Sequence, residues 1–312
     1  MYVLPALHEH CDELEKGFHQ LHLDFQETPE GETIHQLRVN IKKHLAFFRL
    51  LHGIGGKLAL EAIQKPYIKF SRKIGKIRNL EIRQQLVKSE EVALNVKKEY
   101  SKQLKKDIST KTKRVKQSNI VISLIPFKEG SDKLRYSIDR IPQEKVKENL
   151  GAYFHFLLAE IRQIIKEGVT NIEQLHTLRK VLKTLFYNLK LTDRMIPKED
   201  FAKKLYDKLE RLSMQFGNWH DEFITVEKVK KQPDKINKKL FKDLKNKEEK
   251  SRQALKNKFK NISKLTKKIE KEIFRLFDED KEITPPPRRF EKKKYTNIRE
   301  SFDQVNIGES MK

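Results

Sequence analysis

The feature that most constrains the fold of this chain is a helical motif that occurs twice, 141 residues apart. The first copy reads IHQLRVNIK at residues 34–42, and the second reads LHTLRKVLK at residues 175–183. Both contain H-x-L-R-x-x-x-K, and their leucine-rich composition favours an α-helix. A duplicated helical segment at this distance predicts two related all-α halves within one chain.

Each copy places one imidazole and three cations on a single stripe of its helix. Steps of three, four and seven residues keep these side chains within about 60° of one another in projection. The two stripes are His35, Arg38, Lys42 and Arg49, and His176, Arg179, Lys183 and Lys190. Because no acid lies among them, each set repels itself and is costly to desolvate unless an anion lies against it. The stripes therefore predict binding of a polyanion.

A second segment also repeats, at an offset of 142 residues, as residues 70–82 and 212–224. Each copy carries a glycine inside a helical pattern, Gly75 and Gly217, where glycine is less favourable than alanine by about 1 kcal/mol. Matching glycines indicate a close approach of helices or a bend. A basic cluster shares one face of the first copy, and it is either a solvated surface or part of the binding site. It consists of Lys69, Arg72, Lys73 and Lys76.

Taken together, the duplicated segments resemble the CHAD domain, the conserved histidine α-helical domain, over roughly residues 1–278. In that family, H-x-x-R-x-x-x-K helices are followed by segments of the type apolar-Gly-x-x-Arg-Asp-x-Asp-Val. Here Asn79 and Glu81 replace the two aspartates of the first segment, and His220 replaces the arginine of the second, whereas Asp221 is kept.

This resemblance implies two pseudo-two-fold related antiparallel helical bundles around a central basic groove that binds inorganic polyphosphate. The candidate polyphosphate-binding residues are His35, Arg38, Lys42, Arg49, Arg72, Lys73, Lys76, Arg78, His176, Arg179, Lys180, Lys183 and Lys190. We expect no catalytic residues, no metal site and no cofactor.

The expected organisation is an N-terminal half at residues 1–125, a linker at 126–142, a C-terminal half at 143–278 and a mobile tail at 279–312. The linker is predicted as a loop because Gly130 and its polar neighbours favour turns. The apolar run 120–125 fits either a strand or a buried helix. Thr33 and Asn171 are the expected N-caps of the two motif helices.

The net charge of +24 makes nucleic acid, an anionic membrane surface or another polyanion the natural partner. We expect no membrane association, because no run approaches 18 apolar residues, and the basic amphipathic stretch near the end is needed by the bundle. A secretory signal pattern is not seen, so a cytoplasmic protein is expected. The single Cys11 excludes an internal disulfide and is predicted to be buried. His19 and His22 could be metal ligands, but a third ligand with recognisable spacing is absent.

The function predicted from these observations is non-catalytic binding of polyphosphate, which would place the protein at polyphosphate granules. One alternative is a nucleic-acid-binding helical protein, although no basic and aromatic stacking platform is visible. Another is a polyphosphate-processing enzyme or its accessory subunit, although the motif faces offer no acids to hold a metal. Because bound polyanion favours protonation, we also expect His35 and His176 to take up protons around pH 6 to 7.

Overall fold

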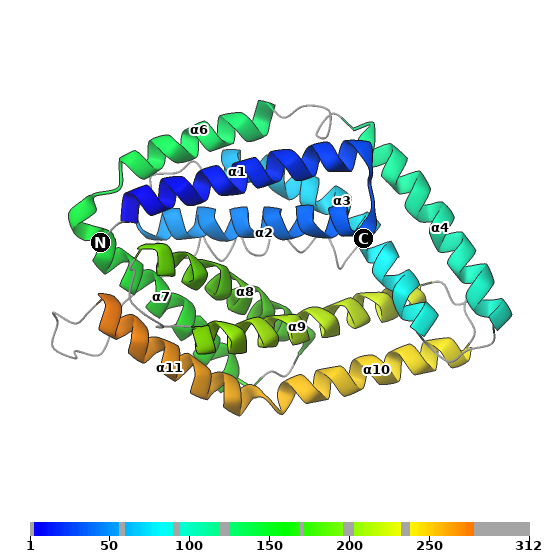
Figure 1. Cartoon of the computed structure of the whole chain (residues 1–312). Helices are drawn as coiled ribbons and strands as arrows, with labels where there is room; N and C mark the ends of the chain where they lie inside the picture. The colour runs from blue at the N-terminus through cyan, green and yellow to red at the C-terminus, as the bar shows by residue number, and fades with distance from the viewer. Residues whose placement is uncertain are drawn as a thin grey trace.

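The computed structural model describes residues 3–55, 60–89, 94–118, 125–168, 171–195, 203–231 and 238–277. These form ten α-helices, and none of the described residues forms a strand. In chain order the helices are α1 (Val3–Glu27), α2 (Gly31–Gly53), α3 (Leu60–Ser89), α4 (Leu94–Lys116), α6 (Ile125–Asp139), α7 (Gln143–Lys166), α8 (Ile172–Met195), α9 (Lys203–Lys230), α10 (Lys238–Lys256) and α11 (Phe259–Phe277). The all-α prediction is confirmed (Figure 1).

The two motif helices, α2 and α8, pack against each other in the middle of the molecule (Figure 1). The helices that carry the second repeated segment, α3 and α9, also pack against each other. Each pair thus joins one element from each half of the sequence. The two-fold relation between the halves stays a prediction.

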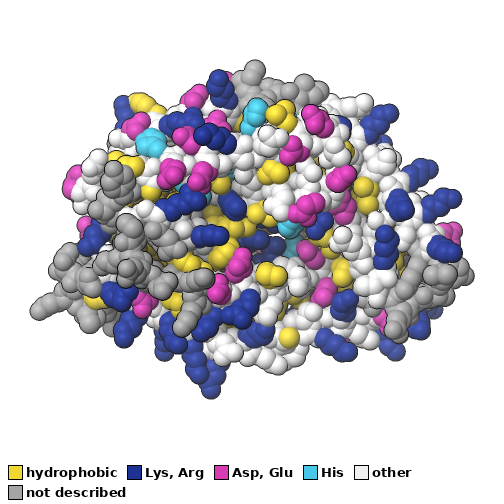
Figure 2. Space-filling view, viewed as in Figure 1, with side chains coloured by type: hydrophobic (Ala, Val, Ile, Leu, Met, Phe, Trp, Pro, Cys, Tyr) yellow, Lys and Arg dark blue, Asp and Glu magenta, His cyan; other side chains and the backbone are white. Residues whose placement is uncertain are grey.

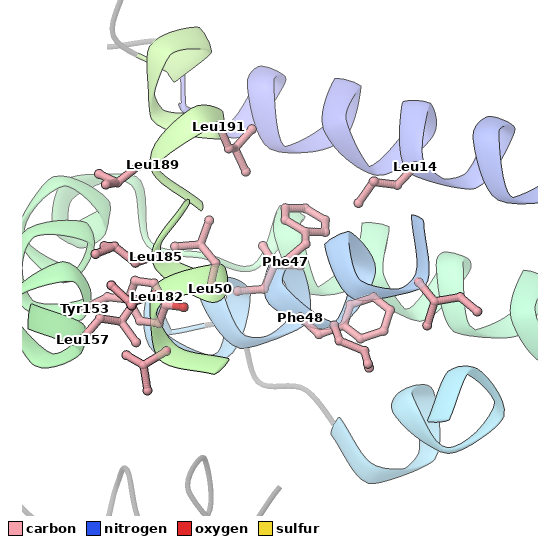
Figure 3. Close-up of a cluster of buried hydrophobic side chains, with 14 of the residues drawn as sticks. Leu14, Phe47, Phe48, Leu50, Tyr153, Leu157, Leu182, Leu185, Leu189 and Leu191 are labelled. Carbon is pink, nitrogen blue, oxygen red and sulfur yellow. The ribbon is translucent and has the colours of Figure 1, made fainter. Parts of the chain in front are cut away.

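One main hydrophobic core extends across both halves, since apolar residues at helical spacing give nearly every helix a buried stripe. Figure 3 shows its centre, where Leu50 of α2 lies beside leucines of α8 and Tyr153 of α7. Asn188 of α8 ties the same helices together, because its amide donates to the Ala46 carbonyl at 3.1 Å and to the Tyr153 hydroxyl at 2.7 Å. Buried polar links of this kind fix the relative placement of helices.

A second, smaller core lies at the far end of the molecule, where the ends of α3 and α9 meet α4 and α10 (right of Figure 1). Its buried residues are Leu80, Val87, Tyr100, Leu104, Val226, Val229, Leu240 and Leu244. The charged sequence before residue 116 therefore still has an apolar stripe that holds α4 against α3. The basic stretch after α9, predicted as helical, is divided between α10 and α11.

The predicted loop at residues 126–142 is wrong, because most of it is helix α6, which packs against α1 and α3. Phe127, Leu134 and Ile138 are buried at spacings of seven and four residues, and this apolar stripe outweighs the turn preference of the residues around Gly130. Helix α7 begins at Gln143, where the second half was expected to begin. The predicted tail 279–312 and most of the run 120–125 lie outside the described residues.

The helix ends agree in part with the predicted caps. Thr33 was the wrong N-cap, since α2 already begins at Gly31 and Glu30 holds the extended N-cap conformation. Asn171 is confirmed as the cap before α8, because its Oδ1 accepts from the Gln174 backbone amide at 2.8 Å. Among the described helices, none combines the length and apolar character needed to cross a membrane.

Candidate functional site

Cations from both copies of the motif meet at two adjoining hollows between α2 and α8. The large hollow has a volume of about 1040 Å³ and the small hollow about 90 Å³. Arg38 and Lys42 of α2 and Arg179 and Lys183 of α8 line both of them. Lys, Arg and His side chains gather around a hollow near the centre of the face in Figure 2. The structure therefore brings together residues that are about 140 positions apart in sequence.

The other candidate residues divide into three groups. His35, Arg78 and Lys190 line the large hollow. Arg49, Arg72 and Lys180 line the small hollow. Lys73, Lys76 and His176 line neither. Ten of the thirteen candidates therefore line one or both of two hollows that share part of their walls.

Helix α3 holds the arginines of the first half in place. The Arg38 guanidinium donates from Nη1 to the Gly75 carbonyl at 3.3 Å and to Asn79 Oδ1 at 3.4 Å. Arg78 Nη1 lies 3.3 Å from Glu81 Oε2 in an ion pair. The two residues that replace the aspartates of the resembled pattern thus contact the arginines of the site. Burial raises the pKa of Glu81, and the charge of Arg78 acts in the opposite direction.

Lys183 is the cation most affected by its surroundings. Burial and then the positive charges of Arg179 and Arg38 lower its pKa to about 8, although the charge of Asp221 acts in the opposite direction. Lys43, which lines the large hollow, also has a lowered pKa because it is partly buried and lies near Lys190. Such a desolvated and self-repelling set of cations favours an anion between the helices.

His176 lies in an aromatic cluster and not on the wall of either hollow. Its ring centroid is 5.1 Å from that of Trp219, 5.1 Å from that of His220 and 5.2 Å from that of Phe223. Burial, with the charges of Arg179 and Lys180, lowers the pKa of His176 to about 4. Burial, with the charge of Arg179, lowers that of His220 to about 3. Both rings are neutral at physiological pH in the free protein.

Two further motif residues, His35 and Arg49, have pKa values lowered by burial. His35 faces the large hollow, and burial followed by the charge of Arg78 lowers its pKa. Arg49 is only 8% exposed, and its Nη1 donates to Thr184 Oγ1 at 3.2 Å across the contact between α2 and α8. Burial lowers the pKa of Arg49 to about 10. Arg49 therefore links the two motif helices as well as lining the small hollow.

Three acids also line the large hollow, namely Glu13, Glu210 and Asp221. Glu13 Oε2 accepts from Arg194 Nη1 at 2.5 Å. Burial would raise the pKa of Asp221, but its hydrogen bond with His220 and the nearby cations hold it below the usual value. Within the described ranges, no group of three or more His, Cys, Asp or Glu side chains is arranged to hold a metal ion, and this includes His19 and His22.

Comparison with known proteins identifies the family. The family model of the CHAD domain matches residues 6–230, which is more than half of the chain. The chain belongs to the CHAD domain family. The crystal structure of the CHAD domain from the plant Ricinus communis is similar, with a TM-score of 0.62 and 12% sequence identity, over 88% of this chain and 92% of that chain. That likeness shows the fold, and a search of curated proteins found no match.

The large hollow of this CHAD domain includes residues that the sequence interpretation missed. Arg194 lines the large hollow and lies four residues after Lys190, so the spacing of the α8 stripe could have predicted it. Lys43 lies off the stripe, and His10 and Glu13 come from α1. The presence of His10 and Glu13 in the hollow depends on how α1 packs against α2 and α8, which the sequence does not indicate.

Proposed function

We propose that this CHAD domain binds inorganic polyphosphate in the hollows between α2 and α8 and does not catalyse its turnover. The observation that carries the proposal is that Arg38, Lys42, Arg179 and Lys183, two from each motif copy, line the same two hollows. Polyphosphate carries about one negative charge per phosphate, and it needs no recognition of bases. A row of cations that converges from two helices matches this chemistry.

The energetics of such a site come from charge neutralisation and release of counterions. Arginine presents a planar fork that can donate two hydrogen bonds to one phosphate, whereas lysine supplies a compact point charge. By analogy with single-stranded nucleic acid, each neutralised phosphate contributes about −0.7 to the slope of log affinity against log salt. Four contacts would give a slope of about −3.

The proposal is tested by comparing two double variants in a polyphosphate titration. Replacing Arg38 and Arg179 by alanine is expected to weaken binding at least about tenfold, because two charged hydrogen-bonding groups are lost. Replacing Lys256 and Lys260, which line neither hollow, is the matched control and is expected to change binding less than about threefold. Equal losses would mean diffuse attraction to a basic surface, and the proposed site would be wrong.

Two further measurements separate this proposal from the alternatives. Duplex DNA and RNA are expected to displace polyphosphate poorly at equal phosphate concentration, and efficient displacement would favour a nucleic-acid-binding protein. Phosphate release from polyphosphate with Mg²⁺ or Mn²⁺ would contradict the non-catalytic part of the proposal. Localisation at polyphosphate granules that is lost in the Arg38 and Arg179 variant would extend the proposal to the cell.

A further inference from the structure

Arg83 is a buried cation outside the two hollows. It lies on α3 between Leu80 and Val87, at the edge of the second core, and only 6% of its surface is exposed. Its Nε atom is buried and makes no hydrogen bond with the part of the chain that the structure describes. The acid nearest to it on α3, Glu81, pairs with Arg78. Because arginine stays charged in proteins, a buried guanidinium whose Nε makes no hydrogen bond with the described residues favours a nearby anion.

Arg83 and further cations act together on Lys228. Lys228 of α9 has a lowered pKa, first because of burial and then because of the positive charges of Lys231, Arg83, Lys76 and Lys111. Lys76 belongs to α3, and Lys111 to α4. The charges that lower the pKa of Lys228 are all positive, so Lys228 lies among cations that come from α3, α4 and the end of α9. The cluster explains the position of Lys76, which lies outside both hollows.

A row of cations connects this cluster to the proposed polyphosphate site. Arg72 lines the small hollow, and Lys76 and Arg83 follow it on α3 at steps of four and seven residues. On a helix these three side chains project within about 40° of one another. The helix rises by about 1.5 Å per residue, so the row is about 16 Å long from Arg72 to Arg83.

We propose that a phosphate chain longer than the central hollows continues along α3 and binds a second anion site formed by Lys76, Arg83 and Lys228. This inference rests on the proposed function, and it adds a preference for long chains. A short chain occupies the central hollows alone, whereas a long chain contacts both sets of cations at once. Because the second contact is then intramolecular, weak individual charges add measurably to affinity.

The test uses the full chain, with tripolyphosphate and long-chain polyphosphate as the two ligands. The variant K76Q/K228Q removes two side chains of the cluster that are at least partly exposed, and R83M removes the buried charge while keeping an unbranched apolar side chain. Both are expected to weaken long-chain binding about three- to tenfold and to change tripolyphosphate binding less than about twofold. A matched variant of two exposed α11 lysines, K260Q/K267Q, is expected to leave both affinities unchanged.

The outcomes distinguish failure of the second anion site from failure of the proposed polyphosphate binding in the central hollows. Unchanged long-chain affinity in K76Q/K228Q and R83M would overturn the second site, as would equal weakening of both ligands. If replacing Arg38 and Arg179 by alanine leaves both ligands bound as tightly as before, the proposed function itself fails. If that variant loses tripolyphosphate while K76Q/K228Q loses nothing, the central site stands and the second site is wrong.

Discussion

The proposed binding of polyphosphate predicts a proton uptake that depends on Lys183. In the free protein its pKa is lowered to about 8, by burial and by the charges of Arg179 and Arg38. A polyphosphate chain in the hollows would oppose those charges and return the pKa toward its usual value of about 10.4. Binding should therefore be tighter when Lys183 is protonated, and affinity should fall as pH rises above 8.

The size of the effect follows from the two pKa values. At pH 7, Lys183 is mostly protonated with or without ligand, so the linkage is nearly absent. At pH 9, the free lysine is about nine-tenths deprotonated and the bound lysine is protonated, which corresponds to about a tenfold loss of affinity. Calorimetry in buffers of different ionisation enthalpy should show an uptake of about half a proton at pH 8 and about 0.9 at pH 9.

The matched variant is K183R, since arginine keeps its charge over this whole range. We expect K183R to bind at pH 7 within a few-fold of the wild type and to lose most of the affinity change between pH 7 and pH 9. Internal phosphates of the ligand stay ionised throughout, so the change belongs to the protein. A wild type without pH dependence in this range, or a K183R variant that keeps all of it, would refute the assignment.

The remaining predictions concern stability and reactivity. A Cβ at Gly53 would lie 2.4 Å from Cδ2 of the buried Tyr153 ring, so Gly53→Ala should lower the free energy of unfolding by about 1–3 kcal/mol in urea denaturation. A Cβ at Gly217 would meet nothing within 4 Å, so Gly217→Ala should raise it by about 0.5–1 kcal/mol, and a loss of stability there would contradict the described packing. Burial raises the pKa of Cys11 to about 12, so iodoacetamide at pH 8 should label it only after unfolding, and rapid labelling of the folded protein would contradict its burial.

Gly217 also corrects one interpretation of the sequence. Matching glycines at 75 and 217 indicated close helix approach or a bend, but the space beside Gly217 is open and forms part of the large hollow. At Gly75 the backbone carbonyl accepts a hydrogen bond from Arg38. The same residue type at equivalent positions thus has different surroundings, which an internal repeat alone does not reveal.

The motif stripes were predictive for the fold and for most of the hollow, because helical periodicity fixes which side chains share a face. His176 belongs to the second stripe but lines neither hollow, because a stripe about 60° wide includes both the edge of the hollow and the edge of the core. The packing of Trp219 and Phe223 from α9 decides between these positions. That choice depends on contacts between helices, as does the arrival of His10 and Glu13 from α1.

The link that Asn188 makes from α8 to Ala46 of α2 and to Tyr153 of α7 has a kinetic consequence. It fixes the backbones that carry the cations, so little rearrangement has to accompany arrival of a ligand. Under the proposed function, long-range attraction to the positive hollows should govern the encounter with polyphosphate, and such association is fast and sensitive to ionic strength. Added salt should therefore slow the capture of polyphosphate more than it speeds its release.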